Sequence, residues 1–401
     1  MRRFKDVELI ILVLILLVTF QACENEENIT EPENNIARGE LVNSNSLGIM
    51  TAGSLEQQFI HNNTPIPFSL KYSVETISIT YYTIDRNGNS EIASGAILIP
   101  RGLDNLPLVS IQHGTQSKND LVSSVSPLNS SEGMVGLIMA SIGYLVVIPD
   151  YLGFGVSTIK HPYLHAESLI PSVIDFMRAA RIYCSNNSIG LNDDVFLTGY
   201  SEGGYASFLA QRKIELDYSD EFNLVAVAPM AGPYDLHGTI ESILQSGEYS
   251  TPAYAAYLFT AYNDLYGWKR LDEIFREPYA SIAPVLFDGS KSWGEINAQL
   301  PATLSELIDP TFMSNINNGG ETEIINAFRE NTILDWIPHA PVNFIHGTAD
   351  EIVPIQNSIT AMNIMMSNGA TNVQLTTIEG GTHESAGPEA AILAISWFET
   401  F

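Results

Sequence analysis

The chain is poor in cysteine and in basic residues. Its 401 residues include two cysteines, and 18 Lys and Arg stand against 46 Asp and Glu, which gives a formal net charge of -28. A chain with this balance is repelled by a phosphate backbone, because nucleic-acid binding needs clustered Lys and Arg. We therefore expect no nucleic acid among its partners.

The motifs that bind nucleotides or metal ions are also missing. The stretch DGSKSWG has no GK pair, as a P-loop requires, and no GxGxxG follows a strand-like run. His161 and His165 are four residues apart and could share a helix face as metal ligands. However, no Glu stands between them as in HExxH, and Pro162 disfavours a helix there. We expect both histidines to be structural, with no metal ion and no cofactor.

The apolar run near the N-terminus is too short to span a membrane, which takes about 20 residues. It covers twelve residues, Leu9–Phe20, and follows three basic residues, which is typical of an export signal. The FQAC at its end resembles the lipobox of bacterial lipoproteins, where cleavage leaves a lipid-modified cysteine at the N-terminus. This resemblance implies a signal peptide over 1–22 and lipidation of Cys23. An ordinary secretory peptide is the alternative.

The segment after Cys23, ENEENITEPENN, is acidic and has no apolar periodicity, so we predict a flexible tether over 23–45. Acidic residues directly after the cysteine resemble the surface-export signal of Bacteroidetes lipoproteins. The resemblance implies an exported protein, anchored in the periplasm or at the cell surface through Cys23. Lipidation would leave Cys184 as the only thiol, so no intrachain disulfide is expected and the core must supply the stability.

Short apolar runs alternate with helix-like segments through most of the remaining chain. LPLVSIQHG, YLVVIPDY, DVFLTGYS and LVAVAPMAG are such runs, and the NG pair of RNGN marks a hairpin ahead of them. Nearly all-apolar strands that alternate with helices indicate a parallel sheet covered on both faces. We predict an α/β fold built on a mostly parallel central sheet.

The alternation stops near Gly232 and resumes with PVNFIHGTAD. The interval has no clear strands and is rich in aromatic residues and helix formers, so we predict a helical cap at 232–338. The core would then consist of two parts, at 46–231 and 339–401, and its last helix would begin at Pro388.

Aromatic residues cluster in the first half of this cap. The cluster comprises Tyr249, Tyr254, Tyr257, Phe259, Tyr262, Tyr266 and Trp268. Aromatic residues at helical spacing can bury a cap against the sheet, and they can also wall a substrate pocket. The sequence leaves both functions open.

A serine lies between glycines where a strand-like run meets a helix-like one. In FLTGYSEGGYASFLAQ, Gly199, Ser201 and Gly203 form a GxSxG motif. A serine hydroxyl is a weak nucleophile and needs a base, an acid that orients the base, and donors for the oxyanion. A strand–turn–helix setting is where GxSxG carries a nucleophile, so we predict that function for Ser201. A glycine-rich turn with a capping serine is the alternative.

The motif and its surroundings resemble the α/β-hydrolase family, in which the acid and the histidine follow the serine in that order. HGTADEIVP supplies Asp350 and EGGTHES supplies His383, each after a later strand-like run. Asp335 is a weaker rival because it precedes its strand; Asp350 could instead cap a helix, and His383 could be structural. PDYLGFGVSTIKHPYLHAESLIPSVIDFMRAAR and GYSEGGYA further resemble the secretory lipases of the fungal lipase A type and related bacterial esterases.

The same resemblance implies an oxyanion hole made of two backbone amides. One belongs to the residue after the nucleophile, Glu202, and the other to a loop after an earlier strand, here IQHGTQ. Thr115 is the preferred second donor and Gly114 the alternative, while His113 would hold the loop.

These residues predict a serine hydrolase that cleaves carboxylic esters, with a small-molecule or lipid ester as substrate. A peptidase on the same fold would use the same triad, although no propeller-like repeat precedes the catalytic region. A non-catalytic binding protein is a further alternative, but such relatives usually lose a triad member, and here all three are present in order. The fold does not specify the substrate, so the acyl chain and the alcohol stay open.

Overall fold

The computed structural model describes residues 37–61 and 66–401. Its fold is formed by the unit from Arg38 to Phe401. The predicted signal peptide, the lipidation site Cys23 and most of the predicted tether lie outside the described residues.

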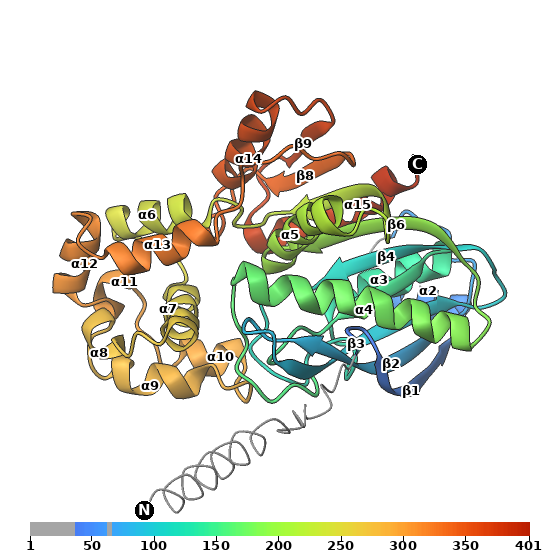
Figure 1. Cartoon of the computed structure of the whole chain (residues 1–401), viewed down its shortest axis with the longest axis horizontal. Helices are drawn as coiled ribbons and strands as arrows, with labels where there is room; N and C mark the ends of the chain where they lie inside the picture. Colours follow the sequence, from blue (N-terminus) through green and yellow to red (C-terminus); the bar gives the residue numbers. More distant parts are fainter. Residues whose placement is uncertain (1–36, 62–65) are drawn as a thin grey trace, which may run out of the picture. The chain divides into compact units, whose positions relative to one another are not determined.

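A nine-stranded sheet runs through this unit (Figure 1), in the order β1-β2-β3-β5-β4-β6-β7-β8-β9. The pairs β1–β2, β2–β3 and β3–β5 are antiparallel, and the remaining pairs of the sheet are parallel. The strands are β1 (Leu41–Met50), β2 (Val74–Ile84), β3 (Ser90–Pro100), β4 (Leu106–Gln112), β5 (Leu145–Pro149), β6 (Leu191–Tyr200), β7 (Asn223–Met230), β8 (Val342–Gly347) and β9 (Val373–Ile378).

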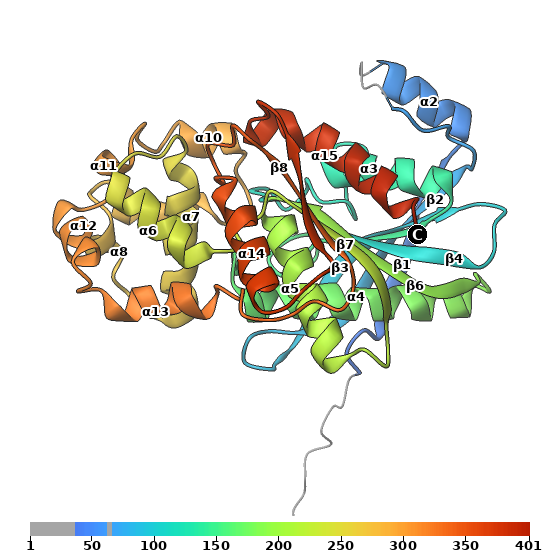
Figure 2. The ribbon, with the colours of Figure 1, turned by 90° about the horizontal axis from the view of Figure 1, so that it is seen from above.

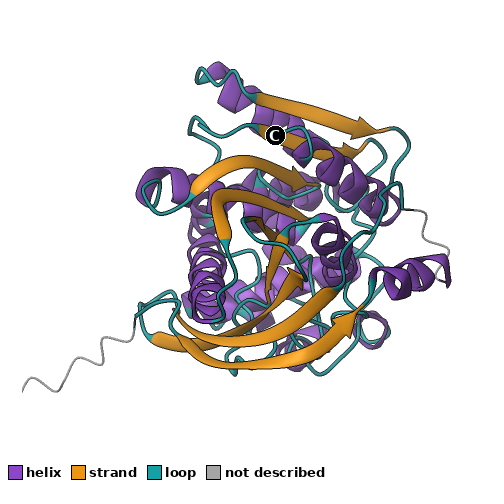
Figure 3. Cartoon of the chain, turned by 90° about the vertical axis from the view of Figure 1, so that its right-hand side faces the viewer, coloured by secondary structure: helices purple, strands orange, loops and turns teal. Residues whose placement is uncertain are grey.

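Helices cover both faces of the sheet (Figure 2), and Figure 3 shows the twisted strands between the two layers. On one face lie α2 (Ala52–His61), α3 (Ser131–Ile142) and α15 (His383–Phe398); on the other lie α4 (Ala166–Asn186), α5 (Glu202–Asp217) and α14 (Gln356–Ser367). The central strands β4 and β5 are almost wholly buried because they are covered on both sides.

A helical insertion separates β7 from β8, as predicted from the interrupted alternation. Its helices gather at one side of the sheet (Figure 1). They are α6 (Leu236–Ser246), α7 (Pro252–Tyr266), α8 (Leu271–Ile274), α9 (Tyr279–Leu286), α10 (Trp293–Asn297), α11 (Leu304–Leu307), α12 (Pro310–Asn317) and α13 (Thr322–Glu330). Helices α6 and α7 come first in this insertion and contribute directly to the site described below.

Ordered structure begins earlier than the sequence predicts. The tether was expected to extend to residue 45, but β1 starts at Leu41 and pairs with β2 at the edge of the sheet. Most residues of β1 are exposed, so the strand is held by its backbone ladder and shows no apolar alternation. The predicted boundary between tether and core is therefore wrong by several residues.

The last helix also begins before its predicted start at Pro388. It starts at His383, where the side chains of Thr382 and Ser385 form a capping box with each other's backbone N–H. This cap satisfies two amides at the helix start and sets the boundary there. Pro388 lies inside the helix, where it removes one backbone donor without ending it.

Candidate active site

Ser201 lies on a sharp turn between β6 and α5. Its backbone has φ 59° and ψ -120°, in the left-handed half of φ space that non-glycine residues rarely adopt. A Cβ on Gly199 or on Gly203 would collide with the carbonyl oxygen of Gln112, so these two positions need glycine. The Ser201 hydroxyl makes no capping bond to α5, which excludes the alternative of a capping serine.

The structure brings the three predicted triad residues together. His383 Nε2 lies 3.0 Å from Ser201 Oγ, and His383 Nδ1 lies 2.7 Å from Asp350 Oδ2. The three side chains follow β6, β8 and β9, and the carboxyl ends of parallel strands meet at one edge of a sheet. With Nδ1–H donating to the carboxylate, Nε2 is free to accept the serine proton.

Asp350 is held by the turn that follows β8 as well as by His383. Its Oδ1 accepts hydrogen bonds from the backbone N–H groups of Ile352, at 3.0 Å, and Val353, at 2.8 Å. Burial favours the neutral acid, but the hydrogen bonds from His346 and His383 outweigh it and lower the pKa of Asp350 to about 2. The rival Asp335 is exposed and accepts a hydrogen bond from Asn368 instead.

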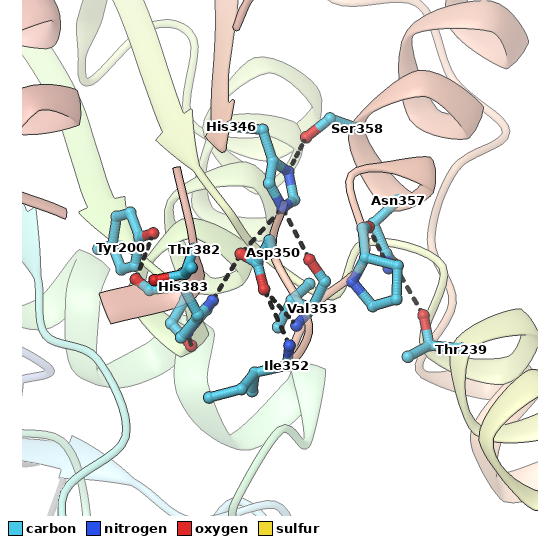
Figure 4. A network of polar contacts seen from close by, with 12 residues as sticks. Tyr200, Thr239, His346, Asp350, Ile352, Val353, Asn357, Ser358, Thr382 and His383 are labelled. Carbon is cyan, nitrogen blue, oxygen red and sulfur yellow. Dashed lines mark hydrogen bonds and ion pairs between the residues drawn. The ribbon is translucent and has the colours of Figure 1, made fainter. Parts of the chain in front are cut away.

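A second buried histidine, His346, contacts the same carboxylate, and sequence reasoning missed it. Figure 4 shows Asp350 between His346 and His383. His346 Nε2 lies 2.8 Å from the Val353 carbonyl oxygen and 3.3 Å from Asp350 Oδ2, while its Nδ1 lies 2.7 Å from Ser358 Oγ. Nε2–H can therefore donate to both oxygens while the Ser358 hydroxyl donates to Nδ1. The signal was its place in HGTAD, four residues before Asp350.

Hydrogen bonding distinguishes Gly114 from Thr115, the two candidates for the second oxyanion donor. The Gly114 N–H donates to Glu132 Oε1 at 3.0 Å and is thus occupied, whereas no acceptor among the described residues is bonded to the N–H of Thr115 or of Glu202. His113 Nδ1 lies 2.7 Å from the Gly114 carbonyl oxygen. The Gly114 carbonyl and the Thr115 N–H belong to the same peptide bond, and in a trans peptide these two groups point in opposite directions. The contact of His113 with the carbonyl therefore turns the Thr115 N–H away from His113.

A narrow cavity opens at Ser201, with a volume of about 50 Å³. Thr115 and Glu202 line it on the side of the core. The cap contributes a mainly apolar wall from α6, α7 and their flanks: Leu236, Thr239, Ile240, Ile243, Tyr249, Tyr254, Ala255 and Leu258. The helical insertion therefore forms one wall of the cavity.

The aromatic cluster of the cap divides into two groups. Tyr249 and Tyr254 line the cavity at Ser201. The other five pack within the protein: Tyr257 stacks on Tyr163 and on Phe287, Phe259 packs edge-on against Phe275, and Tyr262, Tyr266 and Trp268 contact one another. Different residues of the cluster therefore line the cavity at Ser201 and pack the interior of the cap.

Comparison with known proteins gives the same picture as the geometry. Residues 131–400 match the secretory lipase family. The chain belongs to the secretory lipase family. Among solved structures it is similar to the rice cell wall degrading esterase LipA from Xanthomonas oryzae, with 30% identity, a TM-score of 0.80, and coverage of 91% of this chain and 97% of that chain. The expected resemblance to α/β-hydrolase lipases and esterases is confirmed.

Two further similar proteins are fungal. Lipase 6 of Candida albicans is 23% identical over 347 residues, which span 79% of this chain and 70% of that protein. Candida antarctica lipase A is 18% identical with a TM-score of 0.63, and the match covers 87% of this chain and 78% of that one. The similarity to Candida antarctica lipase A is a similarity of fold alone, and it agrees with the predicted α/β-hydrolase architecture.

The two histidines considered as possible metal ligands have different hydrogen-bond partners in the structure. His161 Nδ1 lies 2.8 Å from the Leu152 carbonyl oxygen, and His161 Nε2 lies 2.8 Å from Glu202 Oε1. His165 Nδ1 contacts Ser168 Oγ at 2.8 Å, at the start of α4. Residues 161–165 form no helix, so the two rings do not share a helix face.

The one cysteine in the described residues is a buried free thiol. Cys184 lies in α4, and burial raises the pKa of its thiol to about 12. It is therefore unsuited to nucleophilic chemistry. In the same described part of the chain, no helix is both long and apolar enough to cross a membrane.

Proposed function

We propose that this lipase-family protein hydrolyses carboxylic esters through an acyl-enzyme on Ser201. Family membership makes it a lipase or esterase, and the observation that carries the finer proposal is the hydrogen-bonded series Ser201–His383–Asp350, with distances of 3.0 and 2.7 Å. A neutral imidazole between a hydroxyl and a carboxylate is the arrangement that activates a serine.

The reaction follows from these contacts. His383 Nε2 takes the proton of Ser201 as Oγ bonds to the ester carbonyl carbon, and Asp350 stabilises the resulting imidazolium. The Thr115 and Glu202 amides donate to the oxyanion. When the tetrahedral intermediate collapses, the C–O bond to the alcohol breaks and His383 returns the proton to that oxygen. Water then attacks the acyl-enzyme by the same steps and releases the acid and Ser201.

We assign the cavity at Ser201 to the acyl group of the substrate. Its lining is mainly apolar, as is usual for pockets that hold an apolar group, and its volume is about 50 Å³. A cavity this narrow favours a short acyl chain. We infer short-chain esters as substrates.

The remaining proposals concern export and chain organisation. A signal peptide over 1–22, a lipid anchor at Cys23 and an acidic tether would deliver the core and cap to the outside of the inner membrane. The core would comprise the chain from β1 to residue 231 and residues 339–401, and the cap residues 232–338. The secretory character of the family supports export. The anchor rests on the FQAC sequence.

The test is a panel of p-nitrophenyl esters from acetate to palmitate, measured beside one aminoacyl anilide. We expect hydrolysis of the short esters, little hydrolysis of the anilide, and a fall on the order of 10⁴ to 10⁶ in rate for Ser201→Ala. Faster cleavage of the anilide would favour the peptidase. Full activity of Ser201→Ala would refute the acyl-enzyme on this serine.

A further inference from the structure

The loop between β5 and α4, residues 150–165, touches the oxyanion hole at several points. Its contacts are the Asp150 carbonyl oxygen with His113 Nε2 at 2.9 Å, Tyr163 Oη with Thr115 Oγ1 at 3.2 Å, and His161 Nε2 with Glu202 Oε1 at 2.8 Å. The first two act on the loop that carries the Thr115 amide. The third reaches the residue that carries the other amide donor.

The His161–Glu202 contact is wholly buried. The two side chains are 2% and 0% exposed. Among the described residues, Glu202 Oε2 has no hydrogen-bond partner, so His161 is the polar anchor of this carboxyl group. His161 Nδ1 faces the Leu152 carbonyl and must donate there, so the Nε2–Oε1 contact needs one further proton between its two atoms.

The His161 ring is itself closely confined. The Phe154 ring lies with its centroid 4.6 Å away, and the Tyr151 ring is stacked at 6.0 Å. A Cβ on Gly153 would collide with the His161 backbone. Tyr163 and Tyr257 also face the ring at 6.2 Å. A ring enclosed in this way gives Glu202 a fixed point of attachment.

We propose that His161 is a positioning residue, which holds the Glu202 side chain and thereby aims the Glu202 amide at the oxyanion. The amide and the carboxyl group belong to one residue at the first position of α5, next to the strained Ser201. An amide donor acts on the transition state only when its direction is right, because the oxyanion forms at one place. This inference rests on the proposed function and gives a purpose to a histidine that the sequence suggested only as structural.

His165 supplies a matched control. Both histidines are 5% exposed, lie in the same loop and stay outside the lining of the cavity at Ser201, but the His165 ring contacts Ser168 where the His161 ring contacts Glu202. Burial, with a smaller effect of Arg86, lowers the pKa of His165 to about 4, so at neutral pH its substitution removes no charge. We compare His161→Asn with His165→Asn.

The readout separates positioning from loss of stability. For His161→Asn we expect kcat to fall about 10- to 100-fold, part of the 10²–10³ that an oxyanion donor contributes, with KM changed less than about threefold. Affinity for a trifluoromethyl ketone, which forms an oxyanion adduct, should fall by the same factor as kcat. His165→Asn should keep its kcat even where its melting temperature falls.

Variants at Glu202 provide the second arm. A Gln side chain can donate to His161 Nε2 and keep the hydrogen bond, whereas Ala cannot. The kcat of Glu202→Gln should therefore be about tenfold higher than that of Glu202→Ala. Equal kcat losses in the two Glu202 variants, equal losses in the two histidine variants, or a His161→Asn effect confined to KM would each overturn the inference. Ser201→Ala, measured in parallel, shows separately whether the proposed function itself fails.

Discussion

At the scale of single residues, Asp350 has two tasks. One carboxylate oxygen binds the backbone of the turn at Ile352 and Val353, and the other binds His383 and faces His346. The alternative that Asp350 caps a helix does not describe these contacts, because its backbone partners lie in the turn before α14, which begins at Gln356 and has no side-chain cap. The charge is retained because hydrogen bonds from two histidines outweigh the cost of burial.

We predict that Asp350→Asn lowers kcat on the order of 10⁴. The amide nitrogen of Asn would donate where the carboxylate accepts, so His383 would present the wrong tautomer to Ser201. Asp335→Asn is the control, and it should change kcat less than twofold because Asp335 is exposed and bonds Asn368. Steady-state kinetics on p-nitrophenyl acetate measure both; a larger loss for Asp335→Asn would assign the acid to that residue.

At the scale of elements, the site is assembled from strand ends and closed by the cap. Ser201, Asp350 and His383 follow β6, β8 and β9, and helices α6 and α7 form one wall of the cavity at Ser201. On α7, Tyr254 and Leu258 are four residues apart and share the face that lines the cavity. The same helix buries Phe259 within the cap, against Phe275, Phe312 and Phe328.

We predict that Tyr254→Ala shifts the preferred ester toward longer acyl chains by lengthening the cavity. Each further buried CH₂ contributes about 0.8 kcal/mol, which is severalfold in kcat/KM for every methylene that the longer cavity can hold. Phe259→Leu should lower the melting temperature and leave the chain-length profile unchanged. If Tyr254→Ala left that profile unchanged, the assignment of the cavity to the acyl group would be wrong.

At the scale of the whole molecule, local signals predicted most of the core. Apolar runs and helical spacing located the central strands and helices, and the order of GxSxG, Asp350 and His383 predicted which strand ends meet. The sequence missed β1 because an exposed edge strand has no apolar alternation. It missed Glu132 and His346, and treated His161 only as structural, because their contacts with Gly114, Ser358 and Glu202 join residues from different elements of the fold.

The N-terminal proposals concern residues outside the described structure and need their own experiment. We predict that the mature protein begins at Cys23, carries acyl chains and partitions into detergent. Cys23→Ser should release the protein or leave the uncleaved precursor. N-terminal mass spectrometry with Triton X-114 partitioning distinguishes these outcomes, and a soluble wild-type product that begins downstream of Cys23 would exclude the anchor.

The central claim is that Ser201 is the nucleophile, and covalent labelling tests it most directly. A fluorophosphonate probe followed by peptide mapping should place a single adduct on Ser201. Ser201→Ala should take up no probe while its circular dichroism spectrum and melting temperature stay close to those of the wild type. An adduct on another residue, or labelling that persists in a folded Ser201→Ala variant, would contradict the account.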